Sequence, residues 1–285
     1  IMETEITADI ATLNPKDFEK MIIAKYVDGY SIINIKAING TFNTQHQDNI
    51  RKSVKKLFGM HILKVNDREV MLQSLLGPSE LPIRKGLERI HLLALSMYNS
   101  ALNTLTTFDS SIAKSNLILR DDLLRFYYLV LRQLRSSLLS GRIIRSLKIN
   151  QIDCLDYFAT CQIIMRVSNY AEQILKDVIA LGDFRLPEDV LNSIESFGKN
   201  AINVYLRSLN AFFESTISNS FEIMKPVQTD INIQTLNLNR KLAENKGERI
   251  PCEKMCHVIQ IVANMKRVAD QGIELAETNI PSNTS

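Results

Sequence analysis

The sequence predicts a mainly α-helical fold in which a small α/β linker domain precedes two tandem three-helix bundles. Glycine is sparse, at 10 of 285 residues, which leaves few tight turns and favours long helices. From residue 80 to residue 277, apolar side chains recur every three or four positions, which is the repeat of an amphipathic helix. Residues 1–76 instead alternate short β-branched runs with short helical stretches, and this pattern indicates a mixed unit.

The composition is that of an ordinary globular protein. Hydrophobic residues make up 45% of the chain and charged residues 23%, and the net charge is +3, far from the basic stripe of nucleic-acid binders. No apolar run approaches the ~20 residues of a membrane span, and the acidic first residues do not resemble a secretion signal. We therefore expect a cytoplasmic protein. The first residue, Ile1, leaves open whether translation starts at Met2 or a further segment precedes the chain.

The first domain, residues 1–76, is expected to follow the order β-α-β-α-β-β. Asn14-Pro15 supplies a helix cap and a proline at the first helical position, where its missing N–H costs nothing. Thr44 and Gln47 have the spacing of a capping box, in which each side chain satisfies the backbone donor of the other, and they are expected to start the second helix. The strands are expected at residues 6–10, 30–35, 60–65 and 69–73.

The first bundle is predicted to cover residues 80–182. Its three apolar stripes place helices at residues 82–108, 112–140 and 150–181. The connections between them are short, and short connections make long helices antiparallel neighbours.

The second bundle is predicted to cover residues 187–277. Its helices are expected to start at Pro187, near residue 219 and at Pro251. Pro226 falls inside the middle helix, where proline removes a backbone hydrogen bond and is expected to kink the helix or break its first turns. The polar residues 278–285 are expected to form a disordered tail. The similar order of helices in the two bundles suggests an internal duplication.

Several segments, in this order, carry a resemblance to a known family. The runs DDLLRFYYLVLRQL, IDCLDY and KRVADQGIELAE, at residues 121–134, 152–157 and 266–277, resemble the phosphate-uptake regulator (PhoU) family. The runs IIAKYVDGYSII and LLGPSELP, at residues 22–33 and 75–82, look like the linker of its archaeal branch. In that branch an AbrB-like DNA-binding domain and a small α/β linker precede two PhoU bundles. The resemblance covers residues 15–277.

The resemblance implies a cytoplasmic and dimeric regulator of phosphate uptake that acts through protein partners. The implied partners are a second copy of the chain and a phosphate transporter or a signalling protein, with peripheral contact to a membrane complex. Transcriptional activity through DNA is implied only for the AbrB-like domain, which we expect to lie before Ile1. We assign no DNA contact to this chain.

The resemblance also implies iron, zinc or magnesium as a cofactor. The family carries Glu/Asp-x-x-x-Asp on its helices, and residues four apart share a face from which oxygen ligands converge on a metal. In this chain most of these positions differ. They hold Met165 with Asn169, Pro226 with Asp230, Lys266 with Asp270, and Asp121 and Asp122 with Leu124 in place of the next acid.

The remaining weak metal candidates are Asp121, Asp122, Asp230 and Asp270. A thioether, an amide and an ammonium do not build an oxygen-ligand cluster, and carboxylates on solvated helix faces are the favoured interpretation, also for Glu274. We therefore expect a PhoU-like scaffold whose metal clusters are weakened or lost, and we assign no cofactor.

Other reactive side chains form weaker patterns. Cys252, Cys256 and His257 have part of the spacing of a metal site, but small helix residues are the favoured interpretation for the cysteines. The basic residues Arg51, Lys52, Lys55 and Lys56 indicate a solvated helix face, with a phosphate-contacting patch as the alternative.

The sequence predicts no enzymatic activity, because the histidines at positions 46, 61, 91 and 257 are scattered and no nucleophile motif accompanies them. The alternative to a phosphate regulator is a helical adaptor, or a regulatory module of a transporter or channel, that is unrelated to phosphate.

Overall fold

The computed structural model describes residues 2–12, 14–77, 80–214, 220–244 and 250–278, and over these residues the protein is mainly helical with one small sheet near the N-terminus. The chain forms two compact units. The first comprises Ile1–Ile90 with Asp121–Cys161, and the second comprises His91–Arg120 with Gln162–Ser285. The limits of the two units fall inside helices, whereas the predicted limits fall in connections: residues 76–80 follow a strand, and residues 182–187 lie between two helices. Those predicted domain limits stay a prediction.

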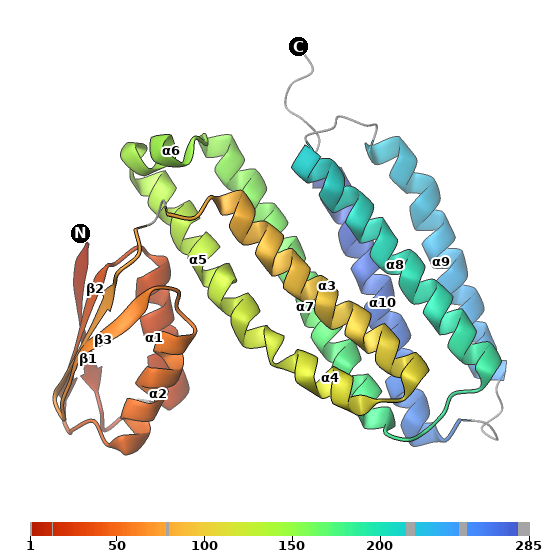
Figure 1. Ribbon diagram of the computed structural model, residues 1–285, viewed down its shortest axis with the longest axis horizontal. Coiled ribbons are helices and arrows are strands. Elements are labelled where there is room, and N and C mark those ends of the chain that lie inside the picture. The colour runs from red at the N-terminus through yellow and green to blue at the C-terminus, as the bar shows by residue number, and fades with distance from the viewer. Residues whose placement is uncertain (1, 13, 78–79, 215–219, 245–249, 279–285) are drawn as a thin grey trace, which may run out of the picture. The chain divides into compact units, whose positions relative to one another are not determined.

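The first unit contains a four-stranded sheet in the order β1-β2-β4-β3. Strands β1 (Glu3–Asp9) and β2 (Ile32–Ile38) are parallel, while β4 (Glu69–Ser74) runs antiparallel to both β2 and β3 (Met60–Val65). Helices α1 (Pro15–Val27) and α2 (Thr44–Lys55) cover one face of the sheet (Figure 1). The element order is the predicted one. Side chains along a strand point alternately to opposite faces, so every second residue faces the helices. The cross-strand pairs Ile33–Leu72 and Ile35–Val70 lie on this face and are buried.

Two local predictions for this sheet region are corrected. The N-cap of α2 is Asn43, whose side chain accepts a hydrogen bond from the amide of His46, while the His46 ring accepts one from the amide of Asn43. The capping box is therefore Asn43–His46, one residue before the predicted pair. Strand β2 begins at Ile32 because the amide of Tyr30 bonds to the carbonyl of Lys25 and so completes the end of α1, beside Gly29 in a left-handed conformation.

The helix predicted over residues 112–140 is two helices, α4 (Ser110–Leu117) and α5 (Leu119–Leu139), which meet at a turn at Ile118. The chain then forms a short helix, α6 (Gly141–Leu147), where a turn was predicted. Lys148 ends α6 in a left-handed conformation. The apolar repeat predicts helical periodicity but not these breaks, since one exposed turn residue leaves the pattern intact.

The long helices otherwise lie close to their predicted positions. They are α3 (Ile83–Thr107), α7 (Gln151–Leu181), α8 (Glu188–Glu214), α9 (Ser220–Glu244) and α10 (Cys252–Thr278). Pro226 lies inside α9, which is one element over its described residues. The predicted tail begins with Thr278, the last residue of α10, and residues 279–285 lie outside the described part of the chain. No helix among the described residues is both long and apolar enough to cross a membrane.

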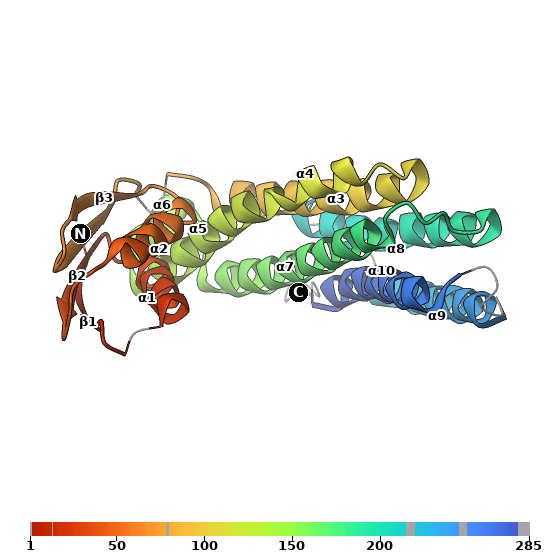
Figure 2. The same cartoon turned by 90° about the horizontal axis from the view of Figure 1, so that it is seen from below.

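In the second unit, α8, α9 and α10 pack against one another, and the three run side by side in both views (Figures 1 and 2). Gly272 of α10 permits the close approach of α8, because a Cβ atom there would lie 2.6 Å from the backbone nitrogen and Cα of Tyr205. The second unit also joins α3 to α8, since the hydroxyl of Tyr98 donates to the carbonyl of Gly198 at 2.9 Å.

Candidate functional site

The four acidic metal candidates lie on helix faces beside cations or amides. Asp121 and Asp122 are exposed in the first turn of α5, and Asp122 lies 3.6 Å from Arg125. The charge of Asp121 also reaches Lys56, whose pKa is raised chiefly by its hydrogen bond to Glu19 and to a smaller extent by Asp121. The carboxylates of Asp121 and Asp122 therefore interact with basic side chains of the first unit.

The other two candidates are each engaged by a residue four positions away on the same helix. The carboxylate of Asp270 accepts two hydrogen bonds from the ammonium of Lys266, at 2.8 and 2.9 Å. The carboxylate of Asp230 accepts one from the amide of Gln234 at 2.6 Å. Among the described residues, no three histidine, cysteine, aspartate or glutamate side chains gather as a metal site.

A guanidinium occupies the face of α7 on which the family resemblance implies metal ligands. Arg120 donates to the hydroxyl of Ser168 at 2.8 Å and to the side-chain oxygen of Asn169 at 2.7 Å, and it pairs with Glu172 at 3.2 Å. A fixed cation held by three partners repels a second cation at the same place. The residues present on this face therefore do not fit a metal cluster.

A second polar cluster joins α7 to α10 within the second unit. The guanidinium of Arg166 donates to the carboxylate of Glu274 at 2.6 Å and to the side-chain oxygen of Gln271. Gln271 in turn donates to Glu274 at 3.1 Å. An arginine that donates to two side chains of the neighbouring helix joins α7 to α10 and leaves both partners occupied.

The sequence reasoning did not identify Asp177, which is the partner of His257. The carboxylate of Asp177 is buried and lies 2.9 Å from the Nδ1 atom of His257, and it also accepts a hydrogen bond from Gln173. The signal available in the sequence is the position of Asp177 beside Ile174 and Val178, which belong to the apolar stripe of α7. A buried polar group inside an apolar stripe must find a partner, because leaving it unpaired is costly.

The cysteines have two different environments. Cys154 and Cys161 are buried, and burial raises the pKa of both thiols, which keeps them protonated and unreactive. Cys252 and Cys256 are exposed on α10. The neighbouring His257 is engaged by Asp177, so the three residues lie on α10 without a further gathered ligand among the described residues.

The basic residues Arg51, Lys52 and Lys55 of α2 are exposed, and Lys56, which follows the helix, is half-buried. Arg51 pairs with Asp48 at 3.1 Å and Lys56 with Glu19 at 2.7 Å, while Lys52 and Lys55 are exposed. The exposed Arg51–Asp48 pair contributes little to stability, whereas the Lys56–Glu19 pair is partly buried. The arrangement agrees with the predicted solvated helix face.

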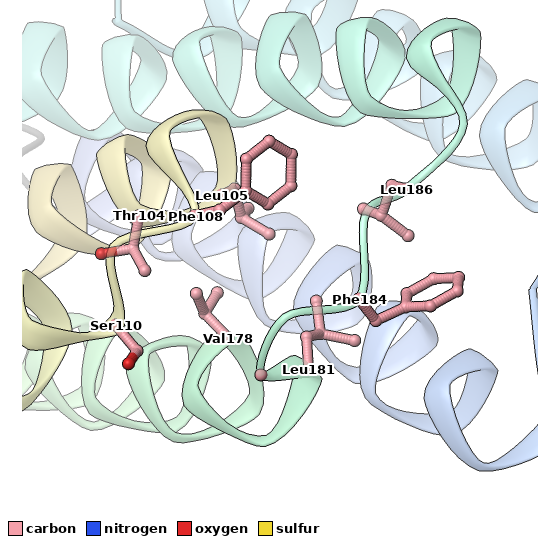
Figure 3. Close-up of a pocket in the computed structure, with 9 residues that line it drawn as sticks. Thr104, Leu105, Phe108, Ser110, Val178, Leu181, Phe184 and Leu186 are labelled. Atoms are coloured by element: carbon pink, nitrogen blue, oxygen red, sulfur yellow. The ribbon is translucent and has the colours of Figure 1, made fainter.

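The second unit contains two hollows that no sequence pattern indicated. One is an apolar cavity of about 10 Å³, room for about one water molecule, where α3 and α7 end (Figure 3). Leu105 and Val178 line it, and Phe108 closes α3 there with a positive φ of 60°. The other is an open groove between α8 and α9 with a volume of about 530 Å³. The groove is large enough to receive a ligand, and the cavity is not.

No family model matches the chain, and no curated protein is significantly similar to it.

Proposed function

We propose that this chain is a non-enzymatic, cytoplasmic regulator of phosphate uptake of the PhoU type, and that it acts by binding partner proteins. The proposal rests on the ordered runs at residues 121–134, 152–157 and 266–277 and on an α/β unit that precedes long helices. In this proposal the long helices form two tandem three-helix bundles. The mutual packing of α8, α9 and α10 supports the second of them.

The observation that carries a binding role, as opposed to catalysis, is the state of the polar side chains on the helices. Arg120, Arg166 and Lys266 are each held by a neighbouring carboxylate or amide. A catalytic centre needs titratable groups that converge on open space, with a base beside a nucleophile. Cations and anions that are paired on helix faces instead hold the helices rigid. They also present fixed polar groups at the surface, and a fixed surface of this kind can recognise another protein.

The proposed homodimer is supported by apolar side chains on the surface of the first unit. Ile152, Leu155 and Phe158 are three residues apart near the start of α7, and each is about half exposed or more, with Leu155 at 63%. Exposed apolar side chains at helical spacing are typical of a protein interface. Sedimentation of Leu155→Glu should give a lighter species than the unmodified chain. Leu92→Glu, at an exposed leucine of α3, should leave the mass unchanged.

The proposal is tested by the dependence of the partners on phosphate. The full chain, purified with its bound proteins from phosphate-starved and from phosphate-replete cells, should return a phosphate transporter subunit or a signalling protein in amounts that differ between the two conditions. A set of partners that is the same in both conditions contradicts the phosphate role. That result would favour the alternative, a helical adaptor unrelated to phosphate.

A further inference from the structure

The groove between α8 and α9 has an apolar floor and polar walls. Its volume is about 530 Å³, and the side chains of Phe197 and Leu238 form the floor, at 3% and 4% exposure. Asparagine, glutamine and serine side chains make up most of the walls. Neutral hydrogen-bonding groups over an apolar floor are the usual composition of a binding site, in which the apolar surface supplies affinity and the polar groups fix orientation.

The groove carries little net charge. Lys241 is the charged residue among the described residues that line it, and its ammonium donates to the carbonyl of Asp189 at 2.5 Å and to the hydroxyl of Ser193 at 2.9 Å. The carboxylate of Asp189 lies 3.4 Å from the same ammonium. Phosphate and nucleic acid bind where positive charge is in excess. The local charge therefore favours an uncharged ligand.

Hydrogen bonds cross the groove at two levels. At one level Asn200 of α8 donates to Gln234 of α9 at 3.1 Å, and at the other Lys241 of α9 donates to Ser193 of α8. Seven residues separate the two levels on each helix, which corresponds to about 10 Å at 1.5 Å per residue. An extended polypeptide advances about 3.3 Å per residue, so about three residues fit between the levels.

Ser196 and Asn237 lie between these two levels. Both are exposed and line the groove, and within the described part of the chain neither side chain has a hydrogen-bonding partner. The carboxamide of asparagine presents one acceptor and a donor pair, which match the N–H and C=O groups of a peptide bond. A backbone laid along the groove would meet Asn237 on one wall and the Ser196 hydroxyl on the other.

Other uncharged ligands match the groove less well. A nucleobase or a sugar ring gains much of its affinity from an exposed aromatic face. Phe197 is the aromatic residue among the described lining residues, and its ring is buried in the floor. The walls offer hydrogen bonds without a stacking surface, which is the requirement of a polypeptide backbone.

We propose that the α8–α9 groove binds a short extended segment of a partner protein through its backbone, with Ser196 and Asn237 as the principal hydrogen-bonding residues. This inference deepens the proposed partner-binding function and names the surface for it. Main-chain hydrogen bonds supply affinity in such recognition, and the flanking side chains of the bound segment supply specificity. The side-chain amides of Asn200 and Gln234 can give up their mutual hydrogen bond and bond to the backbone of the segment, because a peptide group offers the same donor and acceptor as a side-chain amide.

The experiment uses a library of random short peptides displayed on phage and selected on the full chain. A selected peptide is synthesised with a fluorophore, and its affinity is measured by fluorescence anisotropy. We expect Ser196→Ala and Asn237→Ala each to weaken binding severalfold and the double variant to weaken it by about tenfold or more, the equivalent of one to two hydrogen bonds. The same peptide with methylated backbone nitrogens should bind the unmodified chain as weakly as the original peptide binds the double variant, because methylation removes its N–H donors.

The matched control is Asn239→Ala. Asn239 is an exposed asparagine on α9, about 200° around the helix from Asn237, and it does not line the groove. It should bind the peptide like the unmodified chain, and circular dichroism should show equal helix content in all variants. Equal losses in Asn237→Ala and Asn239→Ala overturn the proposal. So does full affinity for the methylated peptide, and so does a selection that yields no peptide dependent on Ser196 and Asn237.

The failure of this inference is distinguishable from failure of the proposed function. If the amounts of bound partners depend on phosphate but the groove variants bind all the same partners, the regulator function is supported and the groove is not its docking site. If a peptide binds the groove but the partners ignore phosphate, the docking site stands and the phosphate role fails.

Discussion

The buried guanidinium of Arg132 caps the end of helix α1: it donates to the carbonyl oxygen of Tyr26 at 2.6 Å and lies 4.6 Å from the centre of the Tyr26 ring. It also donates to the carbonyl of Tyr30 at 2.8 Å. The last carbonyls of a helix have no partner within the helix and carry partial negative charge. A cation at this position therefore supplies hydrogen-bond donors to the carbonyls and balances their charge. Arg132 therefore joins α5 to the α/β part of the first unit.

Replacement of Arg132 should destabilise the protein. Arg132 is 2% exposed, and Arg132→Ala removes two hydrogen bonds and leaves a cavity in place of the side chain. The Tyr26 carbonyl keeps its bond from the Gly29 amide, whereas the half-buried Tyr30 carbonyl loses its Arg132 donor. The expected loss is about 2–3 kcal/mol in the free energy of unfolding, measured in urea. Arg135→Ala is the control, because Arg135 pairs with Asp28 at the surface and should cost less than about 1 kcal/mol. Equal losses would contradict the cap.

His91 should make the stability depend on pH. Burial lowers the pKa of His91 from 6.5 to about 4, and the ring lies 3.1 Å from the hydroxyl of Tyr205. The folded state therefore keeps His91 neutral where the unfolded state binds a proton. The stabilisation is complete above pH 6.5 and is lost as the pH falls from 6.5 to about 4, by an amount on the order of 3 kcal/mol.

This dependence is measured as the free energy of unfolding at several pH values. His91→Gln should flatten the curve between pH 6.5 and 4, because glutamine does not titrate. A slope that persists in His91→Gln would assign the effect to other groups.

Gly272→Ala should lower stability, although alanine usually stabilises a helix by up to about 1 kcal/mol relative to glycine. The added methyl carbon would meet the Tyr205 backbone at 2.6 Å, which forces α8 and α10 apart. We expect a loss of about 1–3 kcal/mol and a lower melting temperature. Gly141→Ala, at the start of α6, meets its nearest side-chain atom at 3.4 Å and should be neutral or stabilising. A stabilised Gly272→Ala variant would show that the two helices are not in close contact.

Added metal should not stabilise the protein. A ligand that binds the folded state alone raises the melting temperature, and the rise grows with the logarithm of the ligand concentration relative to its dissociation constant. Because Asp270 and Asp230 are engaged by Lys266 and Gln234, we expect no shift on addition of magnesium or ferrous iron to dialysed protein. Iron or zinc bound in stoichiometric amount after purification without added metal would contradict this expectation. Asp270→Asn should leave the melting temperature insensitive to metal.

The sequence predicts the helical periodicity and the order of elements well, because both depend on local patterns. Apolar repeats locate α3, α7, α8 and α10 to within a few residues. The cap of α2 is misplaced by one residue because Asn43 and Thr44 are both good caps, and only the backbone geometry distinguishes them. The break at Ile118 leaves no mark in the pattern, since an exposed apolar residue fits a continuous helix equally well.

The polar partners could not be predicted, because they depend on which helix faces meet. The pairs Asp177–His257 and Arg166–Glu274 join residues separated by 80 and 108 positions. The groove residues Ser196 and Asn237 are ordinary polar residues in sequence, and only the packing of α8 against α9 places them on facing walls. Departures from the family's acidic pattern were readable from the sequence, but the presence of Arg120 at that face was not.

The hydrogen bond between Arg132 and Tyr26 joins residues 106 positions apart, which has a consequence for the order of folding during synthesis. The β strands and α1 leave the ribosome well before α5 does, and until α5 arrives the end of α1 lacks the Arg132 guanidinium and the hydrophobic core lacks Tyr128 and Leu131. Bringing distant segments together is a slow step in folding. The nascent α/β segment is therefore incompletely packed until residues beyond 132 have emerged from the ribosome.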